Sequence, residues 1–120
     1  MNSILTSVKK ICSGIQQDDD SFDVDMIIHI NSVFSILNQL GVGPVDGFSI
    51  KDDSAVWTDF IPETDKLYKK LEDVKTYVGL KVKLIFDAPQ SAAAIDALKS
   101  LISELEWRIN VAVEDSRKTE

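Results

Sequence analysis

Five aspartates lie close together near the start of the sequence and are its densest group of chemically active side chains. Closely spaced carboxylates are typical of calcium loops, but an EF-hand loop needs glycine at its sixth position and glutamate at its twelfth. Counted from Asp18, these positions hold Asp23 and His29, so the motif fails. We expect the run Gln16–Asp20 to form an exposed loop, because adjacent carboxylates repel one another and bond to nearby backbone. The five residues are Asp18, Asp19, Asp20, Asp23 and Asp25.

The chain has one histidine and one cysteine, the residue types that most often serve as bases, nucleophiles and metal ligands. His29 lies in an apolar run without a second histidine nearby, so we expect a partly buried structural histidine and not a ligand. Cys12 has helical spacing from Val8 and Ile15, which suits a buried small hydrophobic residue better than a reactive thiol. A single cysteine also excludes an internal disulfide.

Other catalytic and cofactor patterns fail as well. The run Gly41-Val42-Gly43-Pro44 lacks the third glycine and the following helix of a dinucleotide loop, and its proline removes an N–H that would bind phosphate. No Ser, His and acid triad is suggested. A pair of carboxylates stays open in principle, because any two of the twenty acids can meet in a fold, but nothing favours it. We therefore expect no enzyme, no metal and no cofactor.

The composition indicates one globular domain that spans residues 1–120. Apolar residues make up 44% and charged residues 28%, and no window approaches the roughly 18 consecutive apolar residues that a membrane span requires. No export signal is recognisable at the start. We expect a soluble protein without a membrane partner.

The charge is negative and unevenly distributed. A formal charge of -7 argues against binding nucleic acid through its phosphates, which depends on clustered basic residues. Residues 1–65 contain three basic and eleven acidic residues, whereas residues 66–120 contain ten basic and nine acidic ones. These two halves could meet head to tail between copies, or the asymmetry could serve solubility alone.

Apolar periodicity predicts an all-α fold that resembles a four-helix bundle. Helix 23–40 is apolar almost all round, so it is either central to the bundle or covered on one side by its own domain and on the other by a neighbouring subunit. A polar tail is expected to be frayed in the free protein. The expected helices are 2–15, 23–40, 62–86 and 91–113, and the tail is 114–120.

A long loop with glycines and prolines, residues 41–61, separates the second and third expected helices. Loops of this length are often functional. It holds Trp57, Phe60 and Ile61, which either pin the loop to the core or form an arm that docks on a partner. Both interpretations stay open.

The last two expected helices each carry a notable face. In helix 62–86, one face is rich in lysine and is either a solvated surface or an anion-binding stripe. In helix 91–113, Trp107 falls off the apolar stripe and either anchors an interface or closes the side of the bundle. The lysines are Lys66, Lys69, Lys70, Lys75, Lys81 and Lys83.

Several segments together resemble the small head-tail connector proteins of tailed phages and prophages of Gram-positive bacteria. The similarity rests on the order and the residue character of these segments along almost the whole chain. It includes no catalytic signature. The segments are Asn2–Lys10, Ile28–Gly43, Phe48–Phe60 with Trp57-Thr58-Asp59-Phe60, Val74–Val78 leading to Phe86–Pro89, and Glu104–Asn110.

The resemblance implies a structural subunit of the virion neck that is made in the host cytoplasm. Its partners would be further copies of itself in a ring, expected as a dodecamer, together with the portal protein and a stopper or tail-completion protein. Genome DNA would pass through the ring without specific binding, which suits an acidic channel wall because it repels phosphates.

By the same resemblance, the loop 41–61 and the carboxyl-terminal tail are the expected contact regions. A small cytoplasmic regulatory module that binds proteins is the alternative, and an enzyme is a third hypothesis. The candidate interface residues are Trp57, Phe60, Ile61, Trp107, Arg108, Arg117 and Lys118.

Overall fold

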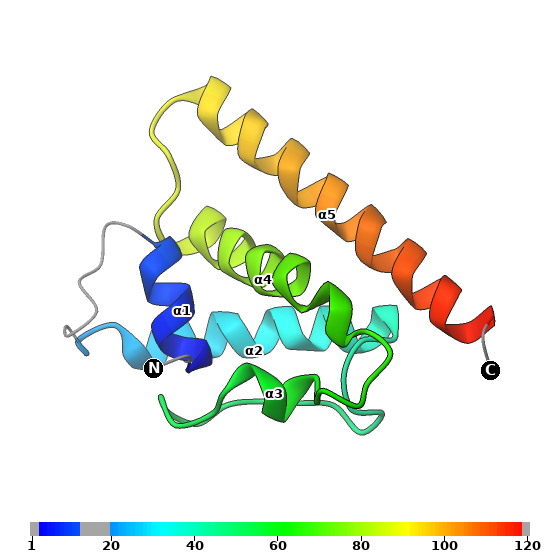
Figure 1. Ribbon diagram of the computed structural model, residues 1–120. Coiled ribbons are helices and arrows are strands. Elements are labelled where there is room, and N and C mark those ends of the chain that lie inside the picture. Colours follow the sequence, from blue (N-terminus) through cyan, green and yellow to red (C-terminus); the bar gives the residue numbers. More distant parts are fainter. Residues whose placement is uncertain (1–2, 13–19, 119–120) are drawn as a thin grey trace.

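The computed structural model describes residues 3–12 and 20–118, and this part of the chain is all-α, as the sequence predicts. The described residues form five α-helices, arranged as in Figure 1, and a short 3-10 helix, η1, precedes α4. The elements are α1 (Ile4–Ile11), α2 (Asp23–Leu40), α3 (Trp57–Phe60), η1 (Tyr68–Lys70), α4 (Leu71–Phe86) and α5 (Ala92–Lys118).

Helix α4 is the centre of the fold. It packs against α1, α2 and α5, and in Figure 1 it lies between α2 and α5. Tyr77 of α4 is completely buried, and its hydroxyl donates a hydrogen bond of 2.7 Å to Glu106 of α5. Burial, together with Glu106, raises the pKa of Tyr77, so the phenol stays protonated and remains a donor.

Local signals explain where α1 begins and where α2 ends. The Ser3 hydroxyl caps α1 by accepting a hydrogen bond of 3.0 Å from the backbone N–H of Thr6. Gly41 ends α2 in the left-handed conformation, with φ at 92°, which a glycine adopts without steric cost. An ion pair between Lys9 and Asp23 ties the end of α1 to the start of α2.

The bounds of α2 are those expected from the sequence, but other helices differ. The first helix ends at Ile11, because the backbone of Cys12 leaves helical geometry; the rest of the expected helix 2–15, with most of the expected loop Gln16–Asp20, lies outside the described residues. The third helix starts at Leu71 and not at residue 62. Asp65 forms a turn there, since its carboxylate accepts a hydrogen bond of 2.8 Å from the N–H of Leu67.

The last helix continues to Lys118, so the expectation of a frayed tail from residue 114 is wrong for the residues up to that point. The cap at Ser91 is as expected, because its hydroxyl accepts a hydrogen bond of 3.1 Å from the N–H of Ala94. At the other end, Val113 is buried and Lys66 donates a hydrogen bond of 3.2 Å to the Ser116 carbonyl. Tertiary contacts thus hold a polar segment in a helix that its sequence alone does not favour.

Helix α2 is not the central helix, because one of its faces is open to solvent. Val24 is 73% exposed and Ile28, one turn later, is 56% exposed. The opposite face packs on α4 and α1 through Met26, Ile30 and other buried residues. The structure therefore does not support the explanation that α2 is central to the bundle.

The long loop is pinned to the core by aromatic rings. Phe34 of α2 has its ring centroid 5.1 Å from that of Phe48, 6.2 Å from that of Trp57 and 4.6 Å from that of Phe60. Polar contacts add to this attachment, since the Asn31 side chain exchanges two hydrogen bonds, 2.8 and 3.0 Å long, with the backbone of Ile50. The segment therefore completes the core and is not a protruding arm.

Close packing at Gly43 provides a test of this arrangement. A Cβ atom at Gly43, where φ is +88°, would overlap the ring of Phe60, whereas a Cβ atom at Gly47, with φ of +95°, would meet nothing within 4 Å. Gly47→Ala should lower the free energy of unfolding by about 1 kcal/mol, because it adds only the strain of a left-handed backbone. Gly43→Ala should lower it by at least about 1 kcal/mol more, because its methyl group also overpacks the core. Urea denaturation of both variants measures the difference, and equal losses would contradict the loop packing described above.

Candidate protein-interaction surfaces

The structure separates the sequence-predicted interface residues into two groups. Trp57, Phe60 and Ile61 are 3%, 1% and 0% exposed and belong to the core. The Trp57 indole N–H also donates a hydrogen bond of 3.1 Å to the Ser7 hydroxyl. The sequence left open whether these loop residues attach the loop to the core or dock on a partner. The structure supports attachment to the core. Trp107, in contrast, is 65% exposed.

Trp107 lies on the outer face of α5. Helical spacing places Val111, which is 36% exposed, one turn further on the same face and opposite the buried stripe that contains Leu105 and Ile109. Beside Trp107, Arg108 forms an exposed ion pair of 2.8 Å with Glu104. The face therefore combines an aromatic, an aliphatic and a guanidinium group, which are typical anchors of protein interfaces.

The remaining two candidates lie at the carboxyl-terminal end of α5. Arg117 is exposed, and its guanidinium lies against the backbone at Gly41. Lys118 is the last residue of α5. The structure thus brings Arg117 to the turn that ends α2, and it does not bring Trp107 and Trp57 together on one surface.

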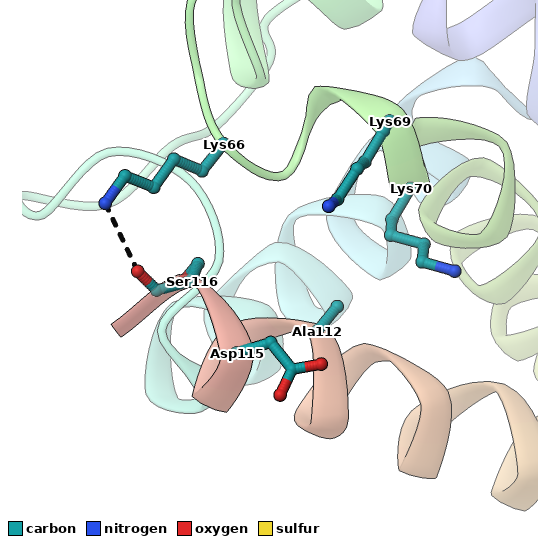
Figure 2. Close-up of a pocket in the computed structure, with 6 residues that line it drawn as sticks. All are labelled: Lys66, Lys69, Lys70, Ala112, Asp115 and Ser116. Carbon is teal, nitrogen blue, oxygen red and sulfur yellow. Dashed lines mark hydrogen bonds between the residues drawn. The ribbon is translucent and has the colours of Figure 1, made fainter. Parts of the chain in front are cut away.

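A hollow of about 570 Å³ lies between the η1 region and the end of α5, and we call it the lysine hollow (Figure 2). Lys69 and Lys70 are exposed, and neither forms an ion pair or hydrogen bond with another described side chain. Lys66, on the same wall, donates its hydrogen bond to Ser116 across the hollow. The lining residues are Lys66, Lys69, Lys70, Ala112, Asp115 and Ser116.

The lysine-rich face predicted for the third helix is consequently divided. Lys75 and Lys83 pair with acids of α4 and its end, at 3.3 Å from Glu72 and 3.1 Å from Asp87. Lys81 lies over the ring of Tyr77, 5.8 Å from its centroid. Charge that is available to a partner is therefore concentrated in the lysine hollow and not spread along a stripe.

A second exposed surface surrounds the start of α2, and we call it the α2 end surface. It combines exposed apolar side chains with carboxylates that face solvent, and it was not among the sequence-predicted sites. The all-round apolar character of the helix was the signal that could have located it. The residues are Asp20, Phe22, Val24, Asp25 and Ile28.

The histidine and the cysteine have structural positions. His29 is half-buried, with its ring centroid 6.1 Å from that of Phe86. Cys12 is completely buried; burial, with a contribution from Asp87, raises the pKa of its thiol to about 11. Neither residue lines the lysine hollow.

The remaining acids and helices give no sign of a metal or membrane site in the part of the chain that the structure describes. Asp52 has a lowered pKa because the Ser54 hydroxyl and N–H both donate to its carboxylate, but this pair lies on an exposed loop. Within residues 3–12 and 20–118, no three His, Cys, Asp or Glu side chains converge as a metal site would require. None of the described helices combines the length and apolar character needed to cross a bilayer.

The described residues form an all-α fold with exposed apolar and charged surfaces. Residues 4–116 match the family model described as phage connector protein, and the chain belongs to that family. It is therefore a structural component of a phage particle, with other head or tail proteins as its partners. No curated protein and no solved structure matches the chain.

The core position of Trp57 leads to a first prediction about these surfaces. Trp57→Ala should lower the free energy of unfolding by about 3–5 kcal/mol, because it leaves a cavity beside Phe34 and removes the indole N–H that donates to the Ser7 hydroxyl. Chemical denaturation followed by circular dichroism measures this loss. A variant that keeps wild-type stability would return Trp57 to the set of surface anchors.

Burial of Cys12 leads to a second prediction. A pKa of about 11 keeps the thiol protonated at pH 8, so a thiol reagent such as dithionitrobenzoate should modify the folded protein at least about 100-fold more slowly than the urea-unfolded protein. Because the folded-state pKa exceeds the unfolded-state value, the protection should persist at neutral pH and weaken as the pH rises towards 11. Rapid modification of the folded protein at pH 8 would contradict this placement.

Proposed function

We propose that this protein is the adaptor that joins the phage portal to the stopper or tail-completion protein at the neck of the virion. The observation that carries the proposal is membership of the phage connector family across residues 4–116. In this role, copies assemble from the host cytoplasm into a ring, a dodecamer that matches the portal, and the ring surrounds the channel through which the genome leaves.

The charge of the protein supports this role. A net charge of -7 gives a ring of many copies a strongly negative field, which repels DNA phosphates and lets the duplex slide without sticking. Three exposed lysines, Lys66, Lys69 and Lys70, lie at the η1 region, and the other exposed lysines of the described residues are scattered over different elements and form no continuous basic track along a helix. Genome DNA therefore passes through the ring without specific binding.

The outer face of α5 is the surface we assign to the portal. Trp107 supplies a large apolar group there, and Arg108 and Val111 flank it along the helix. No residue of α5 before Ile102 is buried, and the first turns of the helix rise away from α4 in Figure 1. Trp107 lies in the second half of α5, which Leu105 and Ile109 hold against the core, so a partner can bind its outer face without disturbing the core.

The decisive experiment is co-expression with the portal protein of the same phage genome, followed by electron microscopy of the purified complex. We expect a ring seated coaxially on the portal. A folded protein that fails to associate with the portal would contradict the proposal and would favour the alternative, a cytoplasmic regulatory module that binds other proteins.

Substitution of Trp107 tests the assigned face. Trp107→Ala should reduce portal binding by about 30-fold or more, the effect of a central aromatic anchor, and leave the unfolding free energy within about 0.5 kcal/mol of wild type. Val45→Ala is the matched control, because Val45 is a 95% exposed apolar residue on the loop after α2. Equal portal binding by both variants would show that Trp107 is not part of the portal interface.

A further inference from the structure

We propose that neighbouring copies of this chain pack head to tail, with the lysine hollow of one copy holding the α2 end surface of the next. The inference rests on the proposed ring function and adds the two surfaces through which the ring closes. Both surfaces are exposed in the isolated chain, and they differ in charge and in shape.

The lysine hollow has the chemistry of a receptor for carboxylates. Lys69 and Lys70 supply two ammonium groups that no other described side chain pairs, and Lys66 adds a third at the far edge. Among the described lining residues Asp115 is the single acid, so positive charge dominates in this part of the hollow. The methylene stems of the lysines and the methyl group of Ala112 also provide apolar surface in which an aliphatic side chain can be buried.

The α2 end surface has the complementary chemistry. Asp20 and Asp25 are exposed, whereas the carboxylate of Asp23 between them is already paired with Lys9. Val24 and Ile28 are the most exposed apolar side chains of α2 and lie on one face of the helix, one turn apart. A basic hollow with apolar walls can bind these two free carboxylates together with the exposed aliphatic pair beside them.

Other acidic segments of the chain fit the hollow less well. Asp52 already accepts two hydrogen bonds from Ser54, and neither it nor Asp53 has a large exposed apolar residue as its neighbour in the sequence. Val45, which is 95% exposed, lies beside the exposed Asp46, but this pair offers a single carboxylate. The α2 end surface combines two exposed carboxylates with two exposed aliphatic side chains of one helix face.

The positions of the two surfaces dictate the kind of contact. The start of α2 and the carboxyl-terminal end of α5 lie at opposite ends of the molecule in Figure 1, and the longest extent of the chain is 43 Å. A copy therefore cannot fill its own hollow. Contact between two different surfaces is heterologous, and such contacts repeat from copy to copy and form a ring when the rotation between copies closes.

Cysteine cross-linking of the full chain tests the contact even when it is short-lived. The variant with Asp115→Cys and Val24→Cys places one thiol in the hollow and one on the α2 end surface, at exposed positions in both cases. Under mild oxidation we expect a ladder of disulfide-linked multimers. The control variant pairs Val24→Cys with Lys99→Cys, an exposed position in the first half of α5, and a ladder no stronger than in this control would overturn the proposal.

Charge reversal tests the chemistry of the contact on this cross-linkable background. Lys69→Glu with Lys70→Glu, or Asp20→Lys with Asp25→Lys, should each reduce the cross-linking yield at least tenfold by placing like charges in contact. An equimolar mixture of the two reversed proteins should recover the ladder, since each then meets an opposite charge. Unchanged yield in the single reversals, or no recovery in the mixture, would overturn the proposed pairing.

The two proposals fail in distinguishable ways. Cross-linking concerns copies of this chain alone, whereas portal co-purification concerns the adaptor role. A strong ladder in a protein that does not bind the portal would support the contact between copies and contradict the adaptor function. A ring that still forms on the portal with both charge-reversed proteins would support the adaptor function and contradict the proposed contact between copies.

Discussion

The need to enclose helix α4 on three sides is the constraint on which the rest of the structure depends. Buried residues of α4 face α1, α2 and α5, and Tyr77 places a polar hydroxyl among them. That hydroxyl has a partner because α5 brings Glu106 within 2.7 Å. The position of α5 along α4 is therefore fixed by a hydrogen bond as well as by apolar packing.

Enclosing α4 uses most of the apolar surface of the domain and determines what remains outside. The loop after α2 contributes its aromatic residues to the core around Phe34, so it has none to present to a partner. The outer face of α5 and the start of α2 stay uncovered, with Trp107 and Val24 among the most exposed apolar side chains. A connector that must contact several neighbours is thus left with separate surfaces in different directions.

Periodicity predicted the elements that have strong local signals. Gly41 marks the end of α2 and Ser91 caps α5, and both signals are carried by a single residue. Two other bounds were missed, one set by a local turn and one by a tertiary contact. The start of α4 is delayed by the turn at Asp65, and α5 continues through a polar segment because Lys66 reaches the Ser116 carbonyl from a distant part of the chain.

By itself, the sequence determined the helical class, the uneven charge and the lack of catalytic and metal motifs, because these follow from residue types and their spacing. It left Trp57 and Trp107 equally plausible as anchors. Only the tertiary structure decided between them, by burying Trp57 against Phe34 and leaving Trp107 in solvent. It alone gathered Lys66, Lys69 and Lys70 opposite Asp115, since proximity between an η1 turn and the end of α5 depends on how α4 and α5 pack.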